Sequence, residues 1–328
     1  MALHYLETGT TDPCYNLAFE QFVLETHTEG DWLILWQNAN TVVVGLNQNT
    51  AEEVNREFVE KNGIRVVRRM TGGGAVYHDL GNLNYSFISD VGDKETLSIR
   101  RFAEPVCRAL RAMGVQAEIS GRNDIVIGGR KVSGCAQRIY KERILHHGTL
   151  LFSSDREMIA GALNADPSKF RSKSAKSVRS RVGNIRDFLP ETIDVHAFWR
   201  RMLYELSQRG MTQEHLTEEE LKTIACLADE KYRSWEWNWG KCPQYSYSNK
   251  KRFPGGTVEV HADVQAGRIR DLIFYGDYLA ATDQKPLLQA LRGQLFERSG
   301  CAAILDRFCL QDMFGEISKE EILSLMFD

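Results

Sequence analysis

The sequence predicts an α+β protein: a large domain built on a mixed or antiparallel sheet with flanking helices, followed by a small α+β domain. The 328 residues are about twice the usual length of one domain. Helical and strand-like patterns alternate along the chain, and glycine-containing turns join strand-like runs. From about residue 245 a hairpin and helices form a self-contained run. We therefore expect a boundary near residues 240–250, between domains 1–244 and 245–328.

The first half of the chain contains clear element boundaries. Asp12 and Pro13 can begin a first helix. Thr50 and Glu53 form a capping box, which predicts one helix that ends at Gly63. Strand-like runs are predicted at 32–36, 41–46, 64–69, 75–79 and 83–88, and an amphipathic helix at 99–113.

The second half continues this alternation. Gly128 and Gly129 suit a two-residue turn that requires positive φ, so residues 124–134 are predicted to form a β-hairpin. The C-terminal unit is predicted to begin with a hairpin that turns at Ala266-Gly267. A further strand is predicted at 146–152, and helices at 195–206, after 217, near 287–296, near 304–310 and after 318.

Charge, hydropathy and cysteine content exclude several classes of protein. The 41 Lys+Arg residues nearly balance 44 Asp+Glu residues, which gives no reason to expect nucleic-acid or membrane binding. The longest apolar runs, 32–36 and 42–46, are far shorter than the ~20 residues of a membrane-spanning helix. The N-terminus does not resemble a signal peptide. Seven scattered cysteines form no metal-binding cluster, so we expect reduced thiols in a cytoplasmic protein.

The most informative segment, RRMTGGGAVYHD at residues 68–79, joins two strand-like runs through three glycines. Glycine lets the backbone approach a ligand closely, and consecutive N–H groups can face an anion. Arg68 and Arg69 add positive charge and donors suited to phosphate or carboxylate. A tight turn with surface arginines is the alternative, but the flanking RR and HD favour a site. The spacing fits neither a P-loop nor a dinucleotide-binding fingerprint.

A second group of polar residues lies on the predicted hairpin. Asp124 could accept a hydrogen bond from a nucleotide base or hold Mg²⁺, which prefers oxygen ligands. Lys131, on the opposite arm, could bridge two anionic groups as a mobile point charge. A single hairpin lysine is, however, more often a solvent-facing residue. Asn123 stands beside Asp124 and shares the same alternatives.

Histidines and a cysteine nearby have competing interpretations. His146 and His147 could line a pocket, although paired histidines in a strand are more often simply half-buried. Cys135 could be a nucleophile if His78 or His147 served as its base. A buried, inert cysteine is the interpretation that the sequence favours.

Taken in order, these motifs resemble the lipoate–protein ligase A family. The family pattern RRx[ST]GGGxVxHDxGN is matched at residues 68–82. GRND, RK[VI]SG and HHGTLL are matched at 121–124, 130–134 and 146–151, and DPxxNLAxE, SxRSR and SWEWNxG at 12–20, 177–181 and 234–240. The C-terminal part resembles the accessory domain of the long ligases. The resemblance implies a catalytic fold of the biotin-ligase and class II synthetase type.

The resemblance implies a two-step reaction. Lipoate and ATP–Mg²⁺ give lipoyl-AMP and pyrophosphate, and the lipoyl group then passes to a lysine of an acceptor protein. The implied acceptors are the lipoyl domains of 2-oxoacid dehydrogenase complexes and the glycine-cleavage H protein. Adenylation brings a carboxylate against a triphosphate, and two unit charges 4 Å apart repel by roughly 4 kcal/mol at an effective dielectric of 20. A cation must offset this repulsion.

Residue roles follow from the matching positions. Lys131 is the expected catalytic cation between the lipoyl carbonyl and the phosphate. The expected ATP-binding residues are Arg69, Gly72, Gly73, Gly74, Ala75, Val76, Tyr77, Asn123, Asp124 and Lys131. The expected lipoate-binding residues are Leu17, Glu20, Trp36, Arg69, Thr71, His78, Lys131 and His147. No set of metal ligands is assigned.

Residues 169–181 contain six basic residues and no acidic one. Because open water would hydrolyse a free adenylate, a mobile cover is expected over it. We expect this segment to be that cover, with Lys176, Arg179 and Arg181 facing the phosphate. A solvated basic loop without a role is the alternative.

Two other functions remain open at this stage. One is an ATP-independent octanoyl or lipoyl transferase that works through a cysteine thioester. The GRND segment, where such relatives carry their nucleophile, contains no cysteine, and the additional C-terminal domain also favours a ligase. The other is a non-catalytic lipoate binder, which would bind lipoate but release no pyrophosphate.

Overall fold

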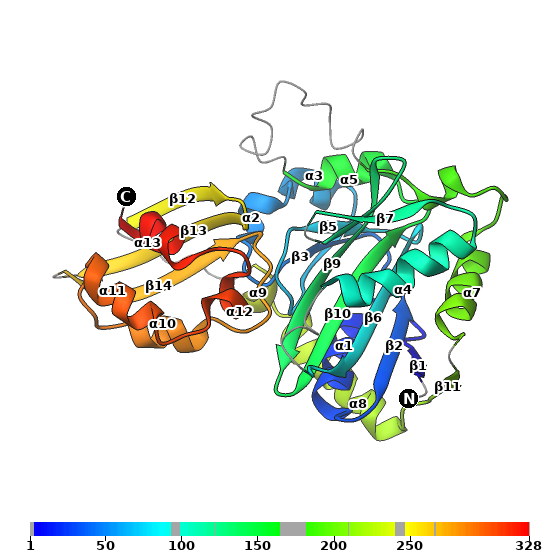
Figure 1. Cartoon of the computed structure of the whole chain (residues 1–328), viewed down its shortest axis with the longest axis horizontal. Helices are drawn as coiled ribbons and strands as arrows, with labels where there is room; N and C mark the ends of the chain where they lie inside the picture. The colour runs from blue at the N-terminus through cyan, green and yellow to red at the C-terminus, as the bar shows by residue number, and fades with distance from the viewer. Residues whose placement is uncertain are drawn as a thin grey trace.

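The computed structural model describes residues 3–92, 99–121, 123–164, 182–208, 210–239, 247–265 and 267–327. Figure 1 shows a large unit with a long sheet and, beside it, a smaller C-terminal unit. Among the described residues, no helix is long and apolar enough to cross a lipid bilayer.

The large unit is organised around a mixed sheet that contains eight strands within the described ranges, in the order β11-β1-β2-β6-β10-β9-β8-β7. β1 runs parallel to β2 and β11, and the neighbours from β2 to β7 are antiparallel. The expected mixed sheet is therefore confirmed. The strands are β1 Leu3–Glu7, β2 Asp31–Trp36, β6 Asn82–Asp90, β7 Ala117–Ser120, β8 Asp124–Ile127, β9 Arg130–Tyr140, β10 Arg143–Leu151 and β11 Met211–Gln213.

A second, smaller sheet carries the glycine-rich segment. Its described strands are β3 Thr41–Val44, β4 Arg65–Arg68 and β5 Val76–His78, in the order β4-β3-β5. β3 runs parallel to β4 and antiparallel to β5. The three glycines therefore lie in the loop that connects the two outer strands of this sheet.

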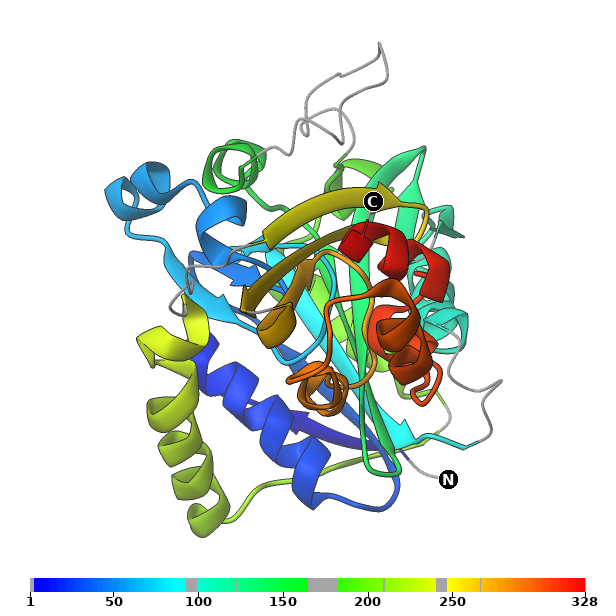
Figure 2. The same cartoon turned by 90° about the vertical axis from the view of Figure 1, so that its left-hand side faces the viewer.

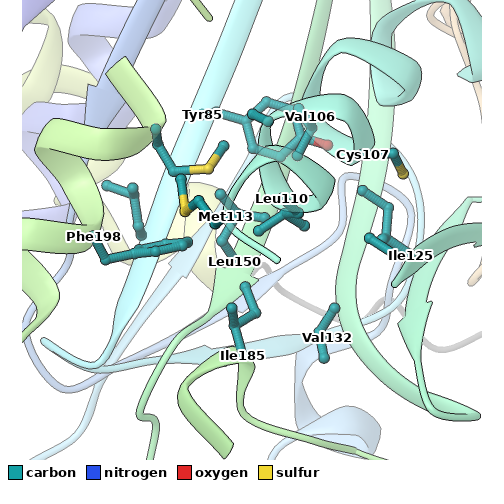
Figure 3. Packing of buried hydrophobic residues seen from close by; sticks show 14 of the residues in the cluster. Tyr85, Val106, Cys107, Leu110, Met113, Ile125, Val132, Leu150, Ile185 and Phe198 are labelled. Atoms are coloured by element: carbon teal, nitrogen blue, oxygen red, sulfur yellow. The ribbon is translucent and has the colours of Figure 1, made fainter. Parts of the chain in front are cut away.

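Helices cover both faces of the large sheet. α1 Pro13–Thr26 packs on one face with α8 Glu218–Leu227, and α4 Ile99–Ala112 and α7 Val195–Leu206 pack on the other (Figure 1). Figure 3 shows the hydrophobic core between the sheet and the helices α4 and α7, where Leu110 of α4 and Phe198 of α7 meet strand residues such as Tyr85. The shorter helices are α2 Thr50–Glu53, α3 Arg56–Lys61, α5 Arg156–Ala162, η3 Ile185–Phe188, η4 Ala228–Tyr232 and α9 Trp235–Asn238.

The start of α1 follows the prediction. The Asp12 side chain accepts a hydrogen bond from the backbone N–H of Cys14, and Pro13 occupies the first helical turn. The N–H groups of the first helical turn have no partner within the helix, so a proline, which lacks an N–H, sacrifices no hydrogen bond there. The pair Asp12-Pro13 is therefore a strong sequence indication of a helix start.

The predicted single helix from Thr50 is wrong. α2 ends at Glu53, the backbone of Val54 is extended, and the Asn55 side chain caps the start of α3. The Thr50 hydroxyl does not cap a helix, because it donates to the Asn238 carbonyl at 2.6 Å and accepts from Arg68 at 2.6 Å. Contacts with residues distant in sequence have replaced the local capping box.

The C-terminal unit has its own hydrophobic core between a three-stranded antiparallel sheet and helices (Figure 2). The predicted hairpin is present, but the helix near 304–310 is wrong, because that range spans the end of one helix and the start of another. The elements are β12 Tyr247–Phe253, β13 Gly256–Gln265, β14 Arg268–Gly276, α10 Lys285–Leu291, α11 Arg298–Leu305, α12 Leu310–Phe314 and α13 Lys319–Phe327. The boundary at 244/245 falls in residues outside the described ranges and stays a prediction.

Residues 277–281, which follow β14, connect the two units through backbone hydrogen bonds. The Gly73 N–H donates to the Tyr278 carbonyl at 3.0 Å, and the Ile139 N–H donates to the Ala281 carbonyl at 2.7 Å. A Cβ atom at Gly72 would lie 2.7 Å from the backbone nitrogen of Ala280. The glycine loop therefore permits close approach of the C-terminal unit's own backbone.

Candidate functional site

A cavity of about 120 Å³ lies between the large sheet and the glycine loop. Eleven of the predicted site residues line it: Leu17, Trp36, Arg69, Gly73, Gly74, Ala75, Val76, His78, Asn123, Lys131 and His147. Lining residues that the sequence prediction missed include Val43, Asn84, Gly134, Ala136, Gly148 and Thr149. The alternation of Asn82, Asn84 and Ser86 along β6 could have indicated Asn84, because alternate residues of a strand share one face.

The floor of the cavity belongs to a row of residues that crosses five neighbouring strands and continues past the cavity to Asp124. Trp36 of β2 pairs with Asn84 of β6, and Asn84 pairs with Thr149 of β10. Thr149 accepts a hydrogen bond from the Gly134 N–H of β9 at 3.3 Å, and Gly134 pairs with Asp124 of β8. Since strands are spaced about 4.8 Å apart, Asn84 and Gly134 are about 10 Å apart across the sheet.

The hairpin of β8 and β9 brings Lys131 to one end of this row. Gly128 and Gly129 have φ angles of 56° and 74°, which confirms the predicted turn. Lys131 Nζ lies 2.7 Å from Asp124 Oδ1, and both side chains are partly exposed. A Cβ atom at Gly134 would lie 3.1 Å from Lys131 Nζ, so the missing side chain leaves room for the ammonium group.

Arg69 holds the glycine loop in shape. Its buried guanidinium donates to the carbonyls of Val43, Gly72 and Gly74, and its Nε donates to the Thr71 hydroxyl. Burial lowers the pKa of Arg69 to about 10, so it remains charged near neutral pH. Most of its donors are therefore used by protein carbonyls.

The sequence predicted that Arg68 and the N–H groups of the glycine loop would be free to bind an anion. In the structure, Arg68 and the Gly73 N–H instead bind protein acceptors. Arg68 does not line the cavity, because its guanidinium donates to acceptors in residues 45–50 and 237–238. The Gly73 N–H, which has a φ of 89°, is directed at the Tyr278 carbonyl. In this arrangement the C-terminal unit uses a donor that we expected to face a phosphate.

A chain of buried hydrogen bonds supports the wall of the cavity opposite Lys131. The His147 Nε2 lies 2.7 Å from the Thr71 hydroxyl, and His147 Nδ1 lies 2.8 Å from Glu20 Oε1. The Ser86 hydroxyl donates to Glu20 Oε1 at 2.6 Å and accepts from Trp36 Nε1 at 2.9 Å. Glu20 and Thr71 thus lie behind the lining and position His147, while the indole N–H of Trp36 is satisfied outside the cavity.

His78 lies in this same wall, and its ring orientation follows from its neighbours. Asn16 donates to the Gln37 carbonyl and to Asn38 Oδ1, which leaves Asn38 Nδ2 directed at His78 Nδ1 at 3.1 Å. His78 Nδ1 is therefore an acceptor, and Nε2 carries the proton. Burial, and then the charges of Arg69 and His147, lower the pKa of His78 to about 3, so the ring is neutral near pH 7.

Other predicted site residues lie away from the cavity or outside the described ranges. The Tyr77 hydroxyl donates to Asn40 Oδ1 at 2.9 Å, and the Tyr77 ring packs in the core beside the small sheet. Gly72 lies against the C-terminal unit and Asp124 against Lys131. Lys176, Arg179 and Arg181 lie outside the described residues, and their role stays a prediction.

Cys135 lines the cavity but is poorly suited to nucleophilic attack. Its thiol donates to the Asn123 carbonyl at 3.3 Å. Burial, followed by the charge of Asp124, raises the pKa of the Cys135 thiol to about 12. The thiolate that a thioester mechanism requires is therefore strongly disfavoured.

Replacing Cys135 with serine is expected to keep pyrophosphate release from ATP and an apolar acid within about tenfold of wild type. Loss of a true nucleophile typically lowers kcat by several orders of magnitude. The measurement is steady-state pyrophosphate release by both proteins, with intact mass confirming that the wild type forms no covalent acyl adduct. A thousandfold loss, or an acyl adduct on Cys135, would instead support the thioester mechanism.

The fold encloses a cavity with apolar residues such as Leu17 and Trp36 and a lysine, Lys131, in its lining, a combination that suits an apolar carboxylic acid. The family models identify the protein further. The model described as "Lipoyl protein ligase A/B catalytic domain" matches residues 12–207, and "Bacterial lipoate protein ligase C-terminus" matches residues 242–326. The chain therefore belongs to the lipoate–protein ligase family.

Curated relatives agree over nearly the full length. The chain is 42% identical over 321 residues to lipoate-protein ligase LplJ of Bacillus subtilis, covering 96% of this chain and 97% of the relative. It is 39% identical over 318 residues to lipoate–protein ligase 1 of Staphylococcus aureus, again covering 96% and 97%.

Solved structures share the same architecture. Plasmodium falciparum LipL1 in complex with lipoate covers 98% of both chains with a TM-score of 0.80 at 22% identity. A bipartite lipoate protein ligase from Thermoplasma acidophilum, described with its E2 lipoyl domain, covers 75% of this chain and 98% of its own (TM-score 0.65, 32% identity). Lipoate-protein ligase A bound with ATP covers 73% and 98% (TM-score 0.62, 30% identity).

Proposed function

We propose that this protein activates lipoate with ATP and transfers the lipoyl group to a lysine of an acceptor protein. The observation that carries this proposal is a single cavity that is apolar beside Leu17 and Trp36 and cationic beside Lys131. Lipoate has the matching chemistry, because an apolar tail ends in one carboxylate. The similarity to a Thermoplasma acidophilum protein described as a putative lipoate protein ligase with bound lipoic acid, and to lipoate-protein ligase A bound with ATP, supports the same assignment.

In the first step a carboxylate oxygen of lipoate attacks the α-phosphorus of ATP, and pyrophosphate leaves. Lys131 offsets the repulsion between carboxylate and phosphate and stabilises the charge that develops there. Arg69, Gly73, Gly74 and Asn123 line the side of the cavity that we assign to the nucleotide. The Gly73 N–H would have to leave the Tyr278 carbonyl before it could donate to a phosphate. In the second step the amine of the acceptor lysine attacks the acyl carbon, AMP leaves, and the amine releases a proton.

Asp124 is the residue that would hold Mg²⁺ together with ATP. Within the described residues no group of three or more His, Cys, Asp or Glu side chains could hold a metal ion. Magnesium in nucleotide sites is usually bound by one or two carboxylates together with phosphates, so a single carboxylate beside Lys131 fits this mode. When bound, Mg²⁺ would neutralise phosphate charge.

The proposed acceptors are lipoyl domains of 2-oxoacid dehydrogenase complexes and the glycine-cleavage H protein. The archaeal ligase described with its E2 lipoyl domain supports the first of these. We also propose that the protein acts in the cytoplasm. The six cysteines within the described ranges are free thiols, as expected in a reducing compartment.

The decisive experiment follows pyrophosphate and acceptor mass with purified protein, ATP–Mg²⁺, lipoate and a lipoyl domain. We expect pyrophosphate release that depends on lipoate, and one lipoyl group added to the acceptor lysine. Acyl transfer without ATP would support the thioester transferase instead. Tight lipoate binding without pyrophosphate release would support a non-catalytic binder.

A further inference from the structure

The wall of the cavity contains a hydrogen-bond donor that has no partner in the part of the chain that the structure describes. His78 Nε2 carries a proton, as shown above, and has no hydrogen-bond partner within the described residues. The side chain is only 3% exposed and lines the cavity. Buried polar groups in folded proteins are nearly always paired, so an unpaired donor at a cavity wall indicates an acceptor on the ligand.

The ring contact of His78 places it beside Trp36, on the side of the cavity where the row across the sheet begins. Its ring is 6.3 Å from that of Trp36, edge to face, and Trp36 pairs with Asn84 at the start of the row across the sheet. Lys131 lies beyond Gly134, about two strand spacings from Asn84, or about 10 Å. With C–C bonds of about 1.5 Å, an extended eight-carbon acyl chain spans roughly 9 Å. A carboxylate at Lys131 therefore brings the far end of such a chain to the side of the cavity that Asn84, Trp36 and His78 line.

The far end of lipoate is a dithiolane ring, and its two sulfurs are the only hydrogen-bond acceptors there. Thioether-like sulfur is a weak acceptor, and a neutral N–H is a suitable partner. The amide nitrogen of Asn84, which also lacks a hydrogen-bond partner among the described residues, faces the same cavity. Octanoate has the same chain length but ends in a methyl group that would leave these donors unpaired.

We propose that His78 donates its Nε2 proton to a dithiolane sulfur and so makes the cavity select lipoate over acids of equal length that lack sulfur. This inference rests on the proposed function and adds to it a residue that determines specificity. Asn84 supplies a second donor to the same ring. Lys131 acts on the carboxylate end and cannot distinguish these acids.

The test compares wild type with His78→Phe, which keeps an aromatic ring and removes the donor. The substrates are lipoate, octanoate and 5-cyclopentylpentanoate, in which carbon replaces both sulfurs of the ring. The readout is the ratio of kcat/KM for pyrophosphate release with lipoate to that with 5-cyclopentylpentanoate. We expect His78→Phe to lower this ratio about fivefold, as loss of one hydrogen bond predicts. His78→Gln, which places an amide N–H near the position of Nε2, is expected to restore most of it.

His146→Phe is the matched control. His146 is also buried, and its Nε2 has no hydrogen-bond partner within the described ranges. Burial lowers the pKa of His146 to about 3, so its ring is neutral as well. His146 stacks between Tyr85 and Phe102, however, and does not line the cavity. This variant should keep the wild-type ratio. An unchanged ratio in His78→Phe, or an equal loss for all three acids, overturns the inference while leaving the proposed function intact.

Two further outcomes are also decisive. If His78→Phe does not fold, His78→Gln is compared with its isostere His78→Met, and equal ratios in the two overturn the inference. If wild type releases pyrophosphate with none of the acids, the proposed function itself fails, and the inference fails with it.

Discussion

Replacing Lys131 with alanine is expected to lower the rate of adenylate formation roughly a thousandfold without unfolding the protein. Removing the cation exposes a repulsion of about 4 kcal/mol between carboxylate and phosphate, and 4 kcal/mol corresponds to about three factors of ten in rate. The Lys131 and Asp124 side chains are 41% and 32% exposed, and such a partly exposed pair contributes at most about 1 kcal/mol to stability. The fold should therefore remain.

The measurement is pyrophosphate release with lipoate and ATP, together with a thermal melt of each protein. Lys141→Ala is the control, because Lys141 lies at the opposite end of β9 from Lys131, in the turn that leads to β10. It should release pyrophosphate as wild type does. A Lys131→Ala protein that adenylates lipoate at the wild-type rate would show that the central role belongs to another residue.

Replacing Arg68 with alanine is expected to destabilise the protein by about 3 kcal/mol or more, and to lower Tm by roughly 10 °C. The Arg68 guanidinium donates to six acceptors at 2.6–3.3 Å: the carbonyls of Gly45, Leu46, Gln48, Trp237 and Asn238 and the hydroxyl of Thr50. Each buried acceptor left unpaired costs about 1–3 kcal/mol, reduced where water can enter. Arg68→Lys should also be destabilised, because three donors on one nitrogen cannot reach six acceptors.

Arg56→Ala is the control for this prediction. Arg56 forms an exposed ion pair with Glu60 one helical turn away, and pairs of this kind contribute about 0.5 kcal/mol or less. The measurement is thermal and urea denaturation of the three variants beside wild type. An Arg68→Ala protein that melts within 2 °C of wild type would show that the loop and α9 do not depend on this guanidinium.

The elements that were predicted correctly are determined by residues that are close together in the sequence. The start of α1 depends on Asp12 and Pro13, which are neighbours, and the hairpin depends on Gly128 and Gly129. Lys131 and Asp124 were expected on opposite arms of that hairpin and do meet. In each case the residues that determine the structure are close in sequence, so the pattern contains the physical reason.

The predictions that the structure contradicts concern residues whose contacts are distant in sequence. The capping box at Thr50 is lost to contacts with Arg68 and Asn238, and Gly73 contacts Tyr278, about 200 residues away. No pattern within one segment of the chain reports such contacts. Gly134 and Thr149 of the cavity floor were missed for the same reason, because the floor combines strands whose mutual register is set by the whole sheet.

The row of residues from Trp36 to Asp124 runs across the strands and not along them. The distance between two residues of the row is therefore a whole number of strand spacings. That spacing is determined by backbone hydrogen bonds, which side-chain substitutions leave almost unchanged. Tolerance for acids of different length is consequently a property of the architecture, inherited with the fold. Discrimination at the two ends of the acid depends on side chains and can change one residue at a time.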